Sequence, residues 1–169
     1  MNEELELLLQ ELALAEKVRY CYQCGTCAGG CPVAGAEPSY NPRRMLEALA
    51  RGEGEAVLAA DELWLCTLCH TCLERCPQGV GLSHVFTRLK EIAAARGHLP
   101  ESLLAELQTL YSAGRVIPLS GPIKRRRAQL GLPAVDQQSG LADLRQIVEA
   151  TSLGRVLAAA RAKGEEKNG

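Results

Sequence analysis

The sequence is poor in the side chains that build β-sheets. Aromatic residues make up 4% of the 169 residues, and valine and isoleucine together number 13, against 27 leucines and 23 alanines. Aromatic and β-branched side chains favour strands, whereas leucine and alanine favour helices. The composition therefore predicts an all-α protein.

The chain also lacks the features of several functional classes. No run approaches the roughly 18 apolar residues of a membrane-spanning helix, so no transmembrane segment is expected. The first residues are acidic, whereas a secretory signal is basic and then apolar, so we expect a cytoplasmic location. The formal net charge of −1 argues against a nucleic-acid partner. No Ser-His-Asp set or carboxylate pair stands out, and no active site is predicted.

Cysteine is abundant, and it occurs in two sets with one spacing. The first set is Cys21, Cys24, Cys27 and Cys31, and the second is Cys66, Cys69, Cys72 and Cys76. Both read C-x2-C-x2-C-x3-C-P, and each cysteine of the second set follows its counterpart by 45 positions. The sequence thus contains an internal duplication that uses all eight cysteines.

Cysteines at this spacing indicate iron–sulfur clusters. The cytoplasm keeps thiols reduced, so the cysteines are expected to bind metal rather than to form disulfides. Three cysteines at two-residue intervals can bind three irons of a [4Fe–4S] cubane, and the fourth iron needs another ligand. In two-cluster ferredoxins, which the spacing resembles, that ligand comes from the other motif. The resemblance implies one cluster on Cys21, Cys24, Cys27 and Cys76 and a second on Cys66, Cys69, Cys72 and Cys31.

Three other uses of the cysteines are possible. Two structural zinc sites would also consume eight cysteines, but zinc modules seldom repeat such a four-cysteine run. Cys66, Cys69 and His70 spell the c-type haem motif C-x-x-C-H, which lies inside the longer run and normally requires export. Reactive thiol chemistry needs a cysteine free of metal, and none is left over. Two clusters remain the preferred interpretation.

Apolar periodicity and capping residues predict helices around the two motifs. They are expected over 2–19, 42–51 with Asn41 as the N-cap, 53–60, 62–65, 83–96 with Ser83 as the N-cap, 100–113 and 142–162. Residues 114–140 contain four glycines and three prolines, and are expected to be irregular. The basic run Lys124-Arg125-Arg126-Arg127 in this region is either a solvated helix face or a docking surface for a partner.

Several segments near the cysteines are typical of one family. They are Cys21-Tyr22-Gln23-Cys24-Gly25-Thr26-Cys27, Cys31-Pro32, Asn41-Pro42-Arg43-Arg44, Trp64-Leu65-Cys66 and Cys72-Leu73-Glu74-Arg75-Cys76-Pro77. Together they resemble the two-cluster iron–sulfur subunit of heterodisulfide reductase over residues 16–100. The resemblance implies an α-helical ferredoxin domain over 1–100, and we assign 101–169 to a helical, partly irregular extension that docks partners.

The resemblance also implies a function. The two-cluster subunit of this family relays single electrons through its [4Fe–4S] clusters between a flavin-containing subunit and a catalytic subunit with Cys-Cys-Gly motifs. The complex is often linked to a hydrogenase or a formate dehydrogenase. This chain has no Cys-Cys pair, so it is expected to be a non-catalytic electron-transfer subunit of an oxidoreductase complex that reduces a disulfide.

Two alternatives to this function stay open. One is the iron–sulfur subunit of a quinone-linked dehydrogenase, although such subunits commonly carry a plant-type cluster domain that is missing here. The other is a structural zinc protein.

Four arginines near the ligands either tune the clusters or form ordinary surface salt bridges: Arg19, Arg43, Arg44 and Arg75.

Overall fold

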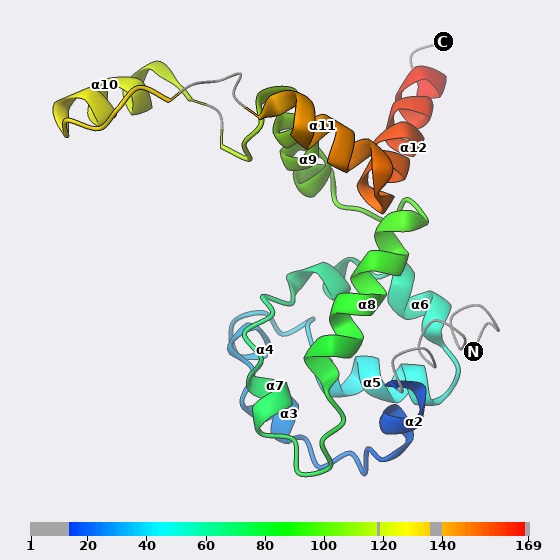
Figure 1. Ribbon diagram of the computed structural model, residues 1–169. Coiled ribbons are helices and arrows are strands. Elements are labelled where there is room, and N and C mark those ends of the chain that lie inside the picture. The colour runs from blue at the N-terminus through cyan, green and yellow to red at the C-terminus, as the bar shows by residue number, and fades with distance from the viewer. Residues whose placement is uncertain (1–13, 118, 136–139, 168–169) are drawn as a thin grey trace. The chain divides into compact units, whose positions relative to one another are not determined.

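The computed structural model describes residues 14–117, 119–135 and 140–167, and the side chains of 16–160 within these ranges (Figure 1). The chain divides into two units, the first ending at Ala94 and the second beginning at Ala95. The described residues form helices and no strand, which confirms the all-α prediction. Within those residues, no helix has both the length and the apolar character needed to cross a bilayer.

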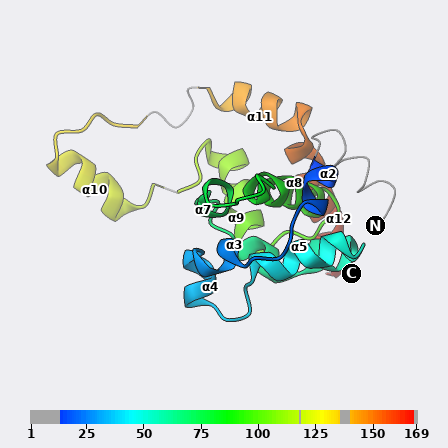
Figure 2. The same ribbon diagram turned by 90° about the horizontal axis from the view of Figure 1, so that it is seen from below.

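The first unit consists of short helices and one long one. Its elements are α2 (Leu14–Arg19), α3 (Thr26–Gly29), α4 (Pro32–Ala36), α5 (Pro42–Ala50), α6 (Gly54–Ala59), the 3₁₀ helix η1 (Asp61–Leu65), α7 (Thr71–Glu74) and α8 (Leu82–Ala95). Helices α3 and α7 each carry the third cysteine of a run and pack side by side (Figures 1 and 2). Of the predicted helix over 2–19, residues 2–13 lie outside the described residues.

Helix α5 begins where the sequence predicts. The Asn41 side chain accepts hydrogen bonds from the backbone amides of Arg43 and Arg44, both at 3.1 Å. Pro42 takes the first helical position, where its missing N–H costs nothing. Leu46 is buried one turn further on. The cap therefore fixes where the side chains of the first turn of α5 lie.

Leucine is the most frequent residue in the core of the first unit, with six of the fourteen buried residues. The buried residues are Val18, Tyr40, Leu46, Leu49, Val57, Leu58, Leu63, Val80, Leu82, Val85, Phe86, Leu89, Ile92 and Ala93. Six of the eight cysteines pack against this core: Cys21, Cys27, Cys31, Cys66, Cys72 and Cys76. The cysteine loops are thus supported on their inner side by apolar side chains.

The predicted N-cap of α8 is wrong. Helix α8 begins at Leu82, so Ser83 lies inside its first turn, where it is buried. The chain enters the helix through Gly81, whose φ of 73° favours glycine. The Gly81 carbonyl accepts the amides of His84 and Val85 at 2.9 and 3.2 Å. Ser83 instead turns its hydroxyl toward His70 Nδ1, at 3.0 Å.

The second unit contains α9 (Glu101–Ala113), α10 (Gly121–Gln129), α11 (Leu141–Ala150) and α12 (Ser152–Lys167). Helices α9, α11 and α12 pack on one another. The predicted single helix over 142–162 is wrong, because Thr151 is extended, with a ψ of 177°, and separates α11 from α12. The turn between them is tight: a Cβ added at Gly154 would lie 2.8 Å from the Val148 carbonyl oxygen.

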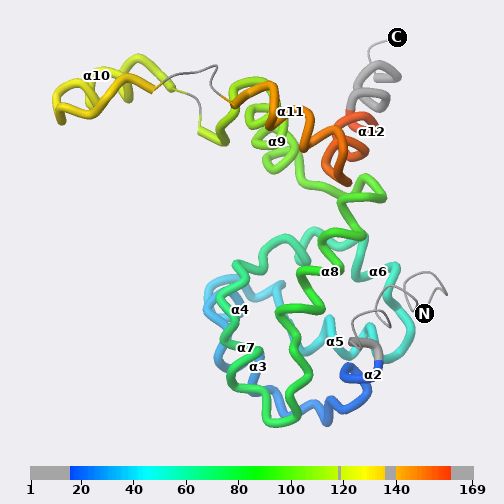
Figure 3. The backbone as a smooth tube through the Cα atoms, viewed as in Figure 1, coloured from blue at the N-terminus to red at the C-terminus, as the bar shows by residue number. Residues whose placement is uncertain are grey.

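Residues 114–140 are less irregular than expected, because the basic run forms part of α10. No residue of α10 is buried. The chain then folds back along the helix, and Arg127 Nη2 donates to the Pro133 carbonyl at 3.1 Å (Figure 3). The basic side chains are thus carried on a short ordered helix.

Candidate functional site

The two cysteine loops share one backbone conformation. Gln23 and Gly25 in the first loop have φ values of 62° and 83°, and Leu68 and His70, each 45 positions later, have 53° and 61°. Positive φ is uncommon for residues other than glycine. Its recurrence at equivalent positions shows that the duplication in the sequence is also a duplication in the structure.

Each loop then closes into a one-turn helix by equivalent hydrogen bonds. The Gly29 amide donates to the Gly25 carbonyl at 2.9 Å, and the Glu74 amide donates to the His70 carbonyl at 3.1 Å. Helices α3 and α7 therefore begin at the same point of their motifs. Their packing brings each loop close to the end of the other.

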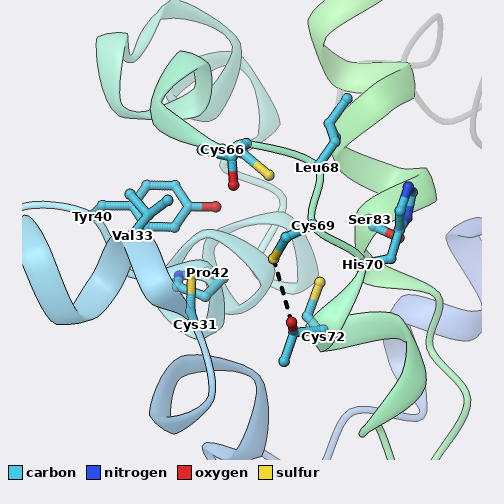
Figure 4. A pocket seen from close by; sticks show the side chains of 12 residues that line it. Cys31, Val33, Tyr40, Pro42, Cys66, Leu68, Cys69, His70, Cys72 and Ser83 are labelled. Atoms are coloured by element: carbon cyan, nitrogen blue, oxygen red, sulfur yellow. Dashed lines mark hydrogen bonds between the residues drawn. The ribbon is translucent and has the colours of Figure 1, made fainter.

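The cysteines gather around two cavities in the crossed grouping that the two-cluster pattern predicts. One small cavity is lined by Cys31, Cys66, Cys69 and Cys72, whose side chains point into it (Figure 4). The other is lined by Cys21, Cys24, Cys27 and Cys76, and Cys72 also reaches it. The fourth cysteine of each run thus lies with the first three of the other run.

The electrostatics of the thiols are also duplicated. Cys24 Sγ lies 3.3 Å from Thr26 Oγ1, and the hydrogen bond between them lowers the pKa of the Cys24 thiol. The hydrogen bond between Cys69 Sγ and Thr71 Oγ1, at 3.4 Å, likewise lowers the pKa of the Cys69 thiol. Figure 4 draws this bond as a dashed line. The second cysteine of each run is exposed, and the threonine two residues later stabilises its thiolate.

The inner thiols are shifted in the opposite direction. Burial raises the pKa of Cys27, and neighbouring Cys21 adds to the effect. Burial raises the pKa of Cys72 to about 11, with a further contribution from Cys66. Four thiolates crowded around a partly buried cavity need a cationic partner, because metal ions replace the thiol protons. The donor set therefore suits iron–sulfur clusters.

A cubane differs from a single ion in the arrangement of ligands that it needs. In the part of the chain that the structure describes, no three Cys, His, Asp or Glu side chains converge where one metal ion could be held. In a cubane each thiolate binds a different iron, so the four ligands surround a larger group.

The arginines singled out in the sequence have different positions. Arg43 lines the cavity of Cys21, Cys24, Cys27 and Cys76. Arg75 belongs to the second cysteine run and lies against Gly30 of the first, since a Cβ added at Gly30 would lie 3.1 Å from Arg75 Nη1. Arg19 and Arg44 are exposed. Only Arg43 therefore lines a cavity that the cysteines form.

Three residues near the thiols were not singled out in the sequence. Gln23 Nε2 donates to Cys21 Sγ at 3.5 Å. Tyr40 is 2% exposed and points its hydroxyl toward Cys66 (Figure 4). Lys90 Nζ donates to the Cys66 carbonyl at 2.6 Å and lies 5.8 Å from the centroid of a Trp64 ring. For Gln23, its position between Cys21 and Cys24 was the only signal in the sequence that could have suggested a contact with a ligand thiol.

Comparisons with known proteins agree with this geometry. The family model of a 4Fe–4S dicluster domain matches residues 17–80. An iron–sulfur subunit of the CoB–CoM heterodisulfide reductase of Methanopyrus kandleri is 35% identical over 136 residues, which cover 79% of this chain and 70% of that protein. The chain belongs to this family of heterodisulfide reductase iron–sulfur subunits.

Other relatives extend the match along the chain. The corresponding iron–sulfur subunit from Methanocaldococcus jannaschii is 31% identical over 166 residues, covering 94% of this chain and 88% of that protein. Its counterpart in the ferredoxin:CoB–CoM heterodisulfide reductase of Methanosarcina mazei is 35% identical over 137 residues, or 81% and 83%. These matches confirm the resemblance drawn from the sequence. The chain is an iron–sulfur protein of the heterodisulfide reductase family, which implies electron transfer within an oxidoreductase complex.

Proposed function

We propose that the chain is an electron-transfer subunit with two [4Fe–4S] clusters. The ligands would be Cys21, Cys24, Cys27 and Cys76 for the first cluster and Cys66, Cys69, Cys72 and Cys31 for the second. The observation that carries the proposal is the crossed grouping of the cysteines around two cavities, in which the fourth cysteine of each run lies with the first three of the other. When bound, each cluster supplies reversible one-electron redox chemistry.

The chain's own residues hold the two sites close together. Cys72 lines both cavities, and α3 packs against α7. The apolar core covers the inner cysteines and limits the access of water, which affects cluster potentials. Adjacent sites in one unit are the arrangement that a relay requires.

The proposed partners are a flavin-containing subunit and a catalytic Cys-Cys-Gly subunit, with a hydrogenase or formate dehydrogenase module as a further electron source. All eight cysteines of this chain line the two cavities. Disulfide reduction is therefore assigned to the Cys-Cys-Gly partner, and this chain has no active site of its own. A cytoplasmic location suits thiols that must stay reduced to bind metal.

The two parts of the chain have different proposed roles. Residues 1–100 form the α-helical ferredoxin domain, and residues 101–169 dock another protein of the complex. The exposed basic face of α10 supports the second role. An acidic partner surface would be attracted to it.

Anaerobic co-purification with the tagged full chain tests the proposal. We expect a flavoprotein and a Cys-Cys-Gly protein to be retained, and about eight irons and eight sulfides per chain for two [4Fe–4S] clusters. Retention of a membrane dehydrogenase would favour the quinone-linked alternative. Zinc in place of iron and sulfide would contradict the electron-transfer role.

A further inference from the structure

The duplicated loops differ at several positions, and one of these, two residues after the first cysteine, provides a contact to a thiol. Gln23 and Leu68 are equivalent, and both have positive φ. Gln23 offers an amide that reaches Cys21 Sγ at 3.5 Å. Leucine has no hydrogen-bonding group, so Leu68 offers Cys66 none. The same backbone therefore provides a side-chain donor in one loop only.

Arg43 fixes the orientation of this amide. Arg43 Nη1 donates to Gln23 Oε1 at 3.1 Å. Because a guanidinium only donates hydrogen bonds, the Gln23 oxygen must face Arg43 and the nitrogen must face Cys21. Arg43 is itself held in place, since it lies in the capped first turn of α5 and its Nη1 is 3.8 Å from a Glu47 oxygen.

The polar side chain that faces the equivalent thiol of the second loop comes from a different segment. Cys66 faces the hydroxyl of Tyr40, which comes from the segment before α5 (Figure 4). Tyr40 is buried in the core of the first unit, so its ring cannot easily turn away. Cys21 and Cys66 are thus equivalent in the duplication, but the polar side chains that face them are unrelated.

We propose that Arg43, acting through Gln23, raises the reduction potential of the cluster on Cys21, Cys24, Cys27 and Cys76, while Tyr40 acts separately on the other cluster. This inference rests on the proposed function and its ligand sets. Reduction adds negative charge to a cluster, and a hydrogen bond donated to a ligand sulfur stabilises that charge. Arg43 is therefore a positioning residue for the donor Gln23.

The test is a redox titration of the iron-loaded full chain, followed by electron paramagnetic resonance. In Gln23→Leu, which copies position 68, we expect one midpoint to fall by about 59 mV, a tenfold change in the one-electron equilibrium. Gln23→Glu keeps the pairing with Arg43 but cannot donate, so the same midpoint should fall. It also serves as the test if the leucine variant binds less iron.

Further variants separate positioning from charge. Arg43→Gln should lower the same midpoint. Arg44 is the next residue and is exposed, so Arg44→Gln removes an equal charge and should leave both midpoints unchanged. Tyr40→Phe should move only the other midpoint. Fully loaded Gln23 variants with unchanged midpoints, or Gln23→Leu and Tyr40→Phe acting on the same midpoint, would overturn the inference alone. A wild-type chain without two cluster signals would overturn the proposed function as well.

Discussion

The ammonium of Lys90 donates to the carbonyl of Cys66 at 2.6 Å, which ties α8 to the start of the second cysteine loop. Lys90 is half-buried, and its ammonium lies 5.8 Å from the centroid of a Trp64 ring. Lys90→Met keeps the stem and removes the donor. We expect it to lower the stability of the iron-loaded chain by about 1 kcal/mol, which is less than a fully buried charged donor contributes, because solvent screens the half-buried ammonium. Anaerobic thermal unfolding measures this, and Lys17→Met, an exposed lysine on α2, should have little effect.

Serine substitution tests the crossed ligand sets. Cys76→Ser should damage the cluster bound by Cys21, Cys24 and Cys27, because Cys76 lines their cavity. Cys31→Ser should damage the cluster of the second run instead. Iron content and the number of paramagnetic signals provide the measurement. Selective loss of the cluster on Cys66, Cys69 and Cys72 in Cys76→Ser would show that the crossed assignment is wrong.

Removal of iron should speed amide exchange in the first unit only. Without iron, crowded thiols such as Cys27 and Cys72 must stay protonated, and nothing links the two loops through their sulfurs. We expect faster amide exchange over 21–31 and 66–77 after anaerobic chelation. Helices α9 and α11 should keep their protection, because they belong to the other unit. Equal loss of protection in both units would contradict this expectation.

Gly154 should be intolerant of substitution. A methyl group there would lie 2.8 Å from the Val148 carbonyl oxygen and 2.9 Å from Glu149 Cα, so Gly154→Ala must shift α12 against α11. We expect a loss of about 1–3 kcal/mol, as for other overpacked sites. Thermal unfolding followed by circular dichroism would measure it. Gly121→Ala is the matched control, because its nearest contact is an arginine side-chain nitrogen at 3.6 Å.

The charge of α10 should affect the binding of partners rather than the binding of iron. Arg125→Glu should reduce retention of partner proteins at low salt, and the difference should shrink as salt rises, because exposed charges are screened. Arg155→Glu, an exposed arginine on α12, serves as the control. Unchanged retention in Arg125→Glu would favour a solvated face for the basic run. Loss of iron in this variant would contradict the separation of roles.

The sequence was sufficient for the features that depend on local chemistry. The Asn41 cap, helices α5 and α6 and the repeated cysteine spacing follow from neighbouring residues, whereas the short helices α3, α4 and α7 were not predicted. The hydrogen bond from Arg43 to Gln23 joins positions 20 apart, and no periodic pattern indicates it. The break at Thr151 also escapes such reasoning, because it depends on how closely Gly154 returns to Val148. Contacts of this kind exist only after the chain has folded.

The contact between Gly30 and Arg75 has a consequence for the history of the two halves. These residues occupy equivalent positions, yet one is the smallest side chain and the other among the largest, and the guanidinium of the second fills the space that the first leaves open. An arginine at position 30 would have to share that space with Arg75. The halves have become complementary rather than identical, so two copies of the second half could not reproduce this packing.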